Sequence, residues 1–132
     1  MSKRPIKTQN APQAIGPYSQ GMIVGETLYI SGQLPMTPDG TLVDNDAKAA
    51  ATQALDNVRA VVEAGGFALK DVVKATIFLR DMGDFPAVNE VYAKYFVDPA
   101  PARACIEVAA LPRGARLEIE AIAIREGRGG TG

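Results

Sequence analysis

The feature that most constrains the fold is a pair of alternating segments near the C-terminus, residues 103–110 and 116–125. In each segment an apolar residue occupies every second position, which is the pattern of a β-strand with two different faces. The linking sequence Leu-Pro-Arg-Gly-Ala contains the proline and the glycine that are typical of a turn. The two segments therefore predict a C-terminal β-hairpin.

The two faces of this predicted hairpin differ in composition. One face is apolar and is expected to lie against helices; it carries Ala104, Ile106, Val108, Ala110, Leu117, Ile119, Ala121 and Ala123. The opposite, mixed face carries Arg103, Cys105, Glu107, Arg116, Glu118, Glu120, Ile122 and Ile124. Because two exposed isoleucines are unfavourable in water, we expect another subunit to cover part of the mixed face. A solvated sheet face is the alternative.

Two amphipathic helices are predicted before the hairpin. Over residues 46–64, apolar residues recur at spacings of three and four, and Gly65-Gly66 follows as a helix end. A second helix is predicted over residues 84–96, with Pro86 in its first turn, where a missing N–H costs nothing. Both apolar stripes require a sheet or another helix to cover them.

Three further strands and a tail complete the chain. Residues 71–79 are rich in β-branched side chains and predict a buried strand, and residues 22–24 and 27–31 predict a short hairpin. The length of 132 residues suits one core, so we expect a single domain over residues 1–126. The glycine-rich segment 127–132 is expected to stay outside that core.

Composition excludes several kinds of function. The chain has 14 basic and 15 acidic residues, so its net charge of −1 provides no field to hold a nucleic acid or an anionic membrane. With no histidine and a single cysteine, it builds neither a Cys/His zinc site nor a Ser-His-Asp triad. Carboxylate-only Mg²⁺ or Ca²⁺ sites stay open, but no Asp/Asn-rich loop of EF-hand type is present, so we expect chemistry without a metal ion. The lone Cys105 and an N-terminus without an apolar stretch lead us to expect a cytoplasmic protein.

Seven segments of the chain resemble segments of a known protein family. They read Ala-Ile-Gly-Pro-Tyr-Ser-Gln (14–20), Ser-Gly-Gln-Leu-Pro (31–35), Val-Lys-Ala-Thr (73–76), Asp-Phe-Pro-Ala-Val-Asn-Glu-Val-Tyr (84–92), Pro-Ala-Arg-Ala-Cys-Ile-Glu-Val (101–108), Leu-Pro-Arg-Gly (111–114) and Leu-Glu-Ile-Glu-Ala-Ile-Ala (117–123). This set resembles the RidA family of reactive intermediate deaminases, and it spans nearly the whole chain.

The resemblance implies both a fold and an activity. The implied fold is a compact α+β subunit of the chorismate-mutase-like type, a mixed β-sheet packed on two α-helices, assembled as a homotrimer with active sites between subunits. The implied activity is the hydrolysis of enamines and imines, especially 2-aminoacrylate and 2-aminocrotonate released by pyridoxal-phosphate-dependent dehydratases, to 2-keto acids and ammonia. No cofactor is implied.

Two residues carry the implied catalysis. A 2-imino acid has a carboxylate that one planar guanidinium binds through both oxygens, and we assign this role to Arg103. A structural ion pair of Arg103 with Glu107 or Glu120 is the alternative. Hydrolysis also needs a carboxyl group that accepts a proton from water and donates one to nitrogen, and we assign this role to Glu118, with Glu120 as its rival.

Five further residues are expected at the pocket. Tyr18 and Asn89 match positions that line it in that family, and they offer a phenol and an amide to orient water or the amino group, although either side chain could be purely structural. Ser31 and Gly32 end a strand, where the glycine lets backbone N–H groups approach a carboxylate; a plain turn residue is the alternative for Gly32. Cys105 is expected to form part of the pocket wall, because imine hydrolysis needs no thiol nucleophile.

Three other functions remain open on the sequence alone. A binding module could hold 2-keto acids or amino acids through Arg103 without turning them over. An interaction protein, either a chaperone or an RNA-acting factor, is the second, and the lack of a basic stripe argues against RNA. A pericyclic enzyme of chorismate mutase type is allowed by the fold alone.

Overall fold

A six-stranded mixed sheet with the strand order β1-β2-β3-β6-β4-β5 is the framework of the computed structural model, which describes residues 2–125. Its strands are β1 (Lys3–Ile6), β2 (Gly21–Val24), β3 (Thr27–Gln33), β4 (Val72–Leu79), β5 (Ala102–Glu107) and β6 (Leu117–Ile124). Strands β4 and β5 run parallel, and all other neighbours run antiparallel.

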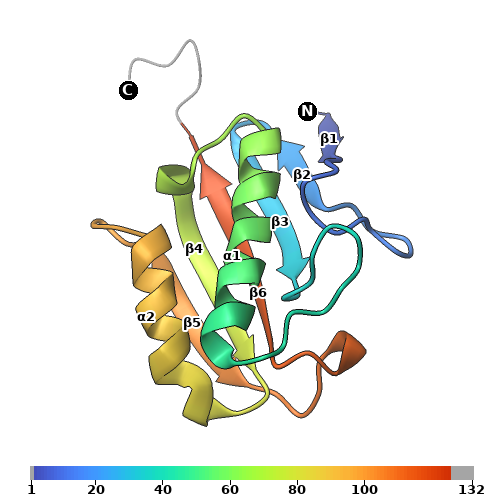
Figure 1. The fold of residues 1–132 in the computed structure, drawn as a ribbon. Coiled ribbons are helices and arrows are strands. Elements are labelled where there is room, and N and C mark those ends of the chain that lie inside the picture. Colours follow the sequence, from blue (N-terminus) through green and yellow to red (C-terminus); the bar gives the residue numbers. More distant parts are fainter. Residues whose placement is uncertain (1, 126–132) are drawn as a thin grey trace.

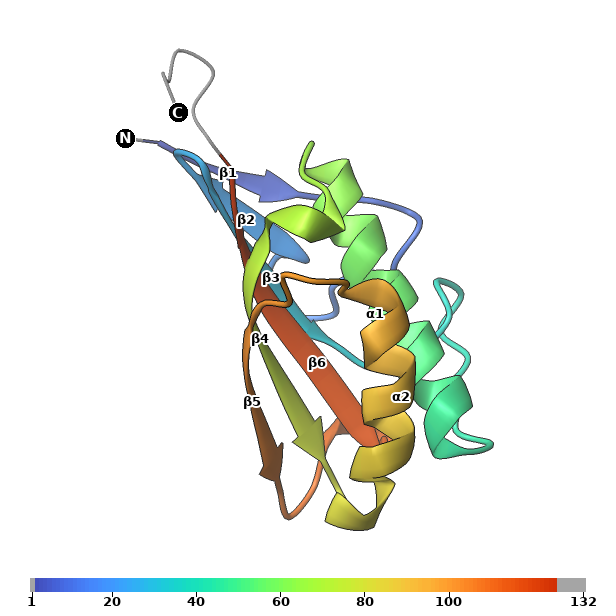
Figure 2. The same ribbon diagram turned by 90° about the vertical axis from the view of Figure 1, so that its left-hand side faces the viewer.

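Both helices lie on one face of this sheet (Figures 1 and 2). Helix α1 (Ala47–Ala64) begins where the Asp46 side chain accepts a hydrogen bond from the Ala49 N–H, at 2.8 Å, and ends at Gly65. Helix α2 (Phe85–Tyr95) has a proline in its first turn. In Figure 2 neither helix covers the opposite face, which we call the open face.

The core fills the space between the helices and the sheet. Alternate residues of β6 point into it, and Leu117, Ile119, Ala121 and Ala123 are buried there as predicted. Ile122 and Ile124 point to the open face, where Ile124 is 48% exposed. The mixed sheet on two helices that the sequence predicted is therefore confirmed.

The prediction of a C-terminal hairpin is wrong, because β4 lies between β5 and β6. Strand β5 pairs in parallel with β4, and α2 provides the crossover connection that two parallel strands require. The turn at residues 112–114 then returns the chain to the other edge of β4, where β6 pairs antiparallel. Periodicity and turn residues do not distinguish such a return from a tight hairpin.

The predicted faces of β5 are also wrong. Arg103 pairs with Ala75 and Cys105 pairs with Ile77, and both partners are buried beneath the helices. Residues directly opposite in a sheet share a face, so Arg103 and Cys105 lie on the helix side. Glu118 pairs with Phe78 and lies on the open face. Alternation identifies which residues of a strand share a face, but the neighbouring strand decides which face is buried.

The remaining elements agree with the sequence, with one omission. The predicted strands near residues 22–31 and 71–79 and both predicted helices are present, with ends that differ by a few residues. Strand β1 was not predicted, because it is four residues long, contains a proline and lies at the sheet edge. The predicted tail 127–132 lies outside the described residues. Within residues 2–125, no helix has the length and apolar character to cross a membrane.

Candidate active site

A β-bulge in β3 organises the first part of the candidate site. Ile30 pairs with Ala121 of β6 and Gln33 pairs with Ile119, so two residues of β3 lie opposite the single residue between these partners. The two extra residues are Ser31 and Gly32. Bulges of this kind bend a strand locally and redirect side chains, and they are frequent beside active sites.

Gly32 in this bulge makes room for the carboxyl group of Glu118. A Cβ atom built on Gly32 would lie 2.6 Å from Oε2 of Glu118 and 2.7 Å from its carboxyl carbon. Any side chain at position 32 would therefore displace the carboxyl group. The close approach explains the glycine without requiring a special backbone conformation.

The electrostatic environment of Glu118 favours its protonated form. Burial raises the pKa of the Glu118 carboxyl above its ordinary value, and the negative charge of Glu120, two residues along the same face, raises it further. A carboxyl group with a raised pKa can both accept and donate a proton closer to neutral pH. Glu118 therefore has the property that general acid–base chemistry requires.

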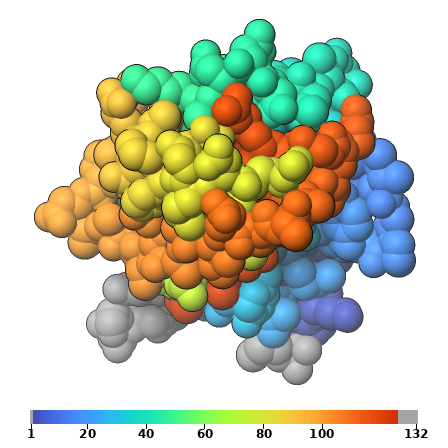
Figure 3. Space-filling view, turned by 90° about the horizontal axis from the view of Figure 1, so that it is seen from below, coloured from blue at the N-terminus to red at the C-terminus, as the bar shows by residue number. Residues whose placement is uncertain are grey.

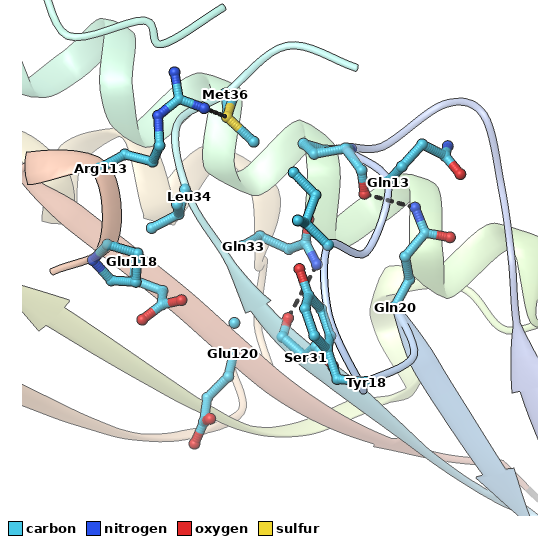
Figure 4. A pocket seen from close by; sticks show the side chains of 14 residues that line it. Gln13, Tyr18, Gln20, Ser31, Gln33, Leu34, Met36, Arg113, Glu118 and Glu120 are labelled. Atoms are coloured by element: carbon cyan, nitrogen blue, oxygen red, sulfur yellow. Dashed lines mark hydrogen bonds between the residues drawn. The ribbon is translucent and has the colours of Figure 1, made fainter. Parts of the chain in front are cut away.

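These residues line a cavity of about 660 Å³. In Figure 4 the carboxyl groups of Glu118 and Glu120 lie on one side of it, and Tyr18 and Ser31 lie on the other. The complete lining is Pro12, Gln13, Ile15, Tyr18, Gln20, Ser31, Gly32, Gln33, Leu34, Met36, Pro112, Arg113, Glu118 and Glu120. The cavity thus combines two carboxyl groups with a largely apolar wall.

Ser31 and Tyr18 have different roles in the cavity wall. The Ser31 hydroxyl donates a hydrogen bond of 2.5 Å to the Ser19 carbonyl, and the Ser31 N–H donates to the Gln20 carbonyl at 3.0 Å. Ser31 therefore fixes the loop that precedes β2. Tyr18, on that loop, is 54% exposed, which leaves its phenol accessible to a ligand.

Arg103 lies in a second cavity, of about 410 Å³, between β5 and α2. Its Nη1 donates a 2.7 Å hydrogen bond to Oδ1 of Asn89. The guanidinium carbon lies 4.8 Å from the ring centroid of Tyr92 and 5.3 Å from that of Phe85. The aromatic faces and the amide orient the guanidinium without neutralising it. Figure 3 shows the molecule from below, where the yellow start of α2 lies against the orange end of β5.

The predicted alternative for Arg103, a structural ion pair, is not found among residues 2–125. The Glu107 carboxylate instead accepts a hydrogen bond of 2.7 Å from the Met82 N–H. Cys105 lies two residues from Arg103 on the same face and packs against the core. Burial raises the pKa of the Cys105 thiol, and the neighbouring guanidinium partly opposes this. A thiol with a raised pKa is a poor nucleophile at neutral pH.

The predicted site residues therefore fall into two groups in one copy of the chain. Tyr18, Ser31, Gly32 and Glu118 lie together at the Glu118 cavity. Arg103, Asn89 and Cys105 lie on the helix side of the sheet. The prediction that Arg103 and Glu118 share a face is wrong, because strand β4 separates their strands and their side chains project to opposite sides.

Comparison with known proteins identifies the family. The family model described as endoribonuclease L-PSP matches residues 8–125. A 2-iminobutanoate/2-iminopropanoate deaminase of Escherichia coli K12 is 49% identical over 128 residues, which cover 95% of this chain and 99% of that protein. The chain belongs to the RidA family.

Two solved structures of RidA-type proteins extend the likeness to the fold. RidA from an Antarctic Psychrobacter has a TM-score of 0.88 at 45% identity and covers 92% of this chain and 99% of its own. TdcF of E. coli with bound serine has a TM-score of 0.87 at 43% identity and covers 93% of this chain and 99% of its own. The predicted RidA-type subunit fold is therefore confirmed.

Sequence reasoning missed several residues of this RidA site. Phe85 and Tyr92, which stack on Arg103, were treated as core or left unassigned. Their spacing gives a signal, because Phe85, Asn89 and Tyr92 follow each other at four and three residues and so share one face of α2. The wall residues Leu34 and Met36 follow β3 in an irregular segment, for which the sequence has no comparable pattern.

The same site offers little to a metal. Within the part of the chain that the structure describes, no group of three or more His, Cys, Asp or Glu side chains is arranged to hold a metal ion. The polar groups at the cavity are carboxyl, phenol, hydroxyl and amide groups and the guanidinium of Arg113, which suit proton transfer and ligand orientation.

Proposed function

We propose that this chain hydrolyses 2-imino acids, formed from 2-aminoacrylate and 2-aminocrotonate, to 2-keto acids and ammonia. The observation that carries the proposal is the Glu118 carboxyl group, whose pKa is raised by burial and which lies against Gly32 in a cavity with an apolar wall. The deaminase name of the E. coli relative, at 49% identity over nearly the full length of both chains, supports the same reaction.

In this proposal Arg103 binds the substrate carboxylate. Its guanidinium has one donor committed to Asn89 and two aromatic rings beside it, so it is held in place and keeps its full charge. A held guanidinium binds both carboxylate oxygens with less loss of side-chain entropy than a free one. The serine bound in the TdcF structure is an amino acid with the same carboxylate group, which agrees with this role.

Glu118 moves the protons in two steps. As an enamine substrate becomes the imine, its C3 carbon gains a proton and its nitrogen loses one. Water then adds to the imine carbon, and Glu118 takes a proton from that water and passes it to the nitrogen, which gives a carbinolamine and leaves Glu118 as a carboxylate again. Glu118 next takes the hydroxyl proton and returns it to the nitrogen. The C–N bond breaks, ammonia leaves and the keto group forms, so Glu118 ends in its starting state.

A complete site under this proposal needs two copies of the chain. Arg103 and Glu118 lie on opposite sides of one sheet, but β5 is an edge strand, so its Arg103 can approach the Glu118 cavity of a neighbour. The open face, with Tyr29 and Ile124 about half exposed, offers an apolar surface for that neighbour. We propose a homotrimer with one site in each cleft between subunits.

An RNA-cleaving function is less compatible with this site, despite the description of the family model. The lining of the cavity includes two acidic side chains, Glu118 and Glu120, and one basic side chain, Arg113, so it has no excess of positive charge to hold a phosphate backbone. The net charge of −1 provides no compensating field. We also propose that the protein acts in the cytoplasm, near the dehydratases that release its unstable substrates.

The test generates 2-aminoacrylate with a serine dehydratase and follows its decay and the formation of pyruvate. Added wild-type protein is expected to accelerate both, and binding of 2-keto acids without acceleration would instead indicate a binding module. Arg103→Ala and Glu118→Ala are each expected to abolish the acceleration.

Co-expression of these two inactive variants tests the shared site. In a randomly mixed trimer, about one quarter of the clefts would combine an intact Arg103 with an intact Glu118 from its neighbour. Mixed trimers are therefore expected to regain up to that share of wild-type activity. Mixtures as inactive as their parents would contradict a site between copies.

A further inference from the structure

The most deeply buried polar side chains of the molecule are all carboxamides. Gln20, Gln33 and Asn57 are 3%, 5% and 1% exposed, and they are the only buried polar side chains within residues 2–125. A buried amide is unfavourable unless its donors and acceptors are paired, so its partners indicate what it does. Here the partners, apart from the Gln53 side chain, are backbone groups in or next to the walls of the Glu118 cavity.

Asn57 joins helix α1 to one wall of the cavity. Its Nδ2 donates to the carbonyl oxygens of Leu34, at 3.0 Å, and Met36, at 2.8 Å. Its Oδ1 accepts a bond of 3.0 Å from Nε2 of Gln53 on the next turn back of the helix. Every polar atom of the side chain is therefore used. The side chains of Leu34 and Met36 line the cavity, in a segment that has left the sheet.

Gln20 holds the opposite wall. Its Nε2 donates to the carbonyl of Pro12 at 2.8 Å and to that of Thr8 at 3.1 Å, and its Oε1 accepts from the Thr8 N–H at 2.7 Å. These bonds fold the loop between β1 and β2. Pro12 and Gln13 of that loop line the cavity, and Gln13 is labelled in Figure 4. This wall is also irregular and has no ladder hydrogen bonds of its own.

We infer that Asn57 and Gln20 are positioning residues that hold the two irregular walls of the Glu118 cavity in the shape that receives the substrate side chain. This inference rests on the proposed function. Glu118 itself stands on β6, inside the sheet, and does not depend on either amide for its place. Loss of an amide is therefore expected to loosen substrate binding while the proton-transfer step is kept.

The position of Asn57 is hard to explain by helix packing alone. Its neighbours on the buried side of α1 are apolar, among them Ala54, Val58 and Val61, and an apolar residue there would serve the core better. The amide donates to the carbonyl of Met36, and it gives the carbonyl of Leu34 a second donor beside the Met36 N–H.

The experiment compares Asn57→Ala with Val62→Ala, which removes a buried side chain from the same helix away from the cavity. Steady-state kinetics are measured with 2-iminopropanoate and 2-iminobutanoate generated in situ. For Asn57→Ala we expect KM to rise about tenfold while kcat stays within about twofold of wild type. A rise of about tenfold is the effect of losing one methylene-sized apolar contact between the cavity and the substrate. Val62→Ala is expected to leave both constants unchanged.

Backbone hydrogen exchange gives a second readout that does not depend on activity. The Met36 N–H donates to the Leu34 carbonyl at 2.8 Å, and the Val43 N–H donates to the Pro35 carbonyl at 2.6 Å. Both amides are expected to exchange faster in Asn57→Ala, while those of β6 keep their protection. Gln20→Ala is expected to act in the same way on the Thr8 amide.

The outcomes separate the two hypotheses. An inactive wild-type protein would contradict the proposed function, whereas the exchange data would still test the amides. Unchanged exchange at Met36 and Val43 in Asn57→Ala would overturn the positioning role by itself. Faster exchange with an unchanged KM, or an equal rise of KM in Val62→Ala, would overturn the inferred role in substrate binding.

Discussion

Arg103 and Glu118 lie in surroundings that act differently on the charge of the side chain. Arg103 lies on the helix side, where two aromatic rings and the Asn89 amide orient the guanidinium and no described carboxylate pairs with it. Glu118 lies on the open face, where burial and a neighbouring negative charge raise its pKa. The cation needs only orientation, whereas the acid needs an environment that disfavours its charge.

Under the proposed function, this difference suits Arg103 to carboxylate binding and Glu118 to proton transfer. A guanidinium keeps its proton at any physiological pH, so aromatic packing is sufficient to hold it. A carboxyl group that transfers protons must be partly desolvated, and the β-bulge with Gly32 allows this. Substitutions at Glu118, Arg103 or Gly32 each alter one of these two regions.

The largest effect is expected at Glu118. Glu118→Gln keeps the shape of the side chain but removes its proton transfer, so kcat should fall by about 10²–10⁴-fold with a smaller change in KM. Steady-state assays on 2-iminopropanoate measure both constants. The matched control is Glu120→Gln on the same strand face, for which the fall should be below about tenfold. A reversed order would assign the acid–base role to Glu120.

The next largest effect is expected at Arg103. Arg103→Ala removes charged hydrogen bonds to the substrate carboxylate, and kcat/KM should fall by about 10²-fold. Arg103→Lys keeps the charge but loses the planar, two-oxygen contact, so it should recover only part of that loss. The measurement is kcat/KM together with the binding of a 2-keto acid. Full activity of the lysine variant would rule out a two-oxygen contact.

A smaller effect is expected at Gly32, which acts through Glu118. In Gly32→Ala the new Cβ would collide with the Glu118 carboxyl group, so activity should fall by about tenfold. The test is a double-mutant cycle with Glu118→Gln. Once Gln replaces Glu118, the alanine at position 32 should cost little further activity. An equal loss in both backgrounds would mean that Gly32 acts independently of Glu118.

The smallest effect concerns stability. Because the pKa of Glu118 is raised in the folded state, its ionisation opposes folding, and this unfavourable contribution grows as pH rises through the folded pKa. Glu118→Gln should therefore be more stable than wild type at neutral pH, by less than about 1 kcal/mol for a partly exposed group. Unfolding curves at equal protein concentration should converge below the unfolded-state pKa. A variant that is less stable at neutral pH would contradict the raised pKa.

The sequence predicted the helices and strands themselves more reliably than it predicted which strands pair with each other. The stripes of α1 and α2 and the alternation of β6 depend on local periodicity, so they were visible in the chain. The pairing of β5 with β4 was not visible in the sequence, because it depends on the crossover through α2. The same limit applied to the site, since Arg103 and Glu118 were recognised but assigned to one face.

The sequence also could not predict the cavity wall at Leu34 and Met36 or the amide that holds it, for a related reason. A buried Asn in a helix and an irregular segment 21 residues away have no common pattern in the sequence, and only tertiary structure brings the amide to the carbonyl of Met36. The periodicity of a sequence indicates which side chains of a strand or helix are buried. It does not indicate which side chain donates a hydrogen bond to a backbone carbonyl that is distant in the sequence.

By itself, then, the sequence determined the residue types and periods: two helices, strands with unlike faces, an arginine and two glutamates that are candidates for catalysis, and no histidine. Tertiary structure decided where they meet. It inserted β4 between β5 and β6, turned Arg103 toward α2 and turned Glu118 toward the open face. The reason is that alternation has a period of two residues and specifies faces only relative to each other, whereas the pairing of distant strands fixes which face is covered.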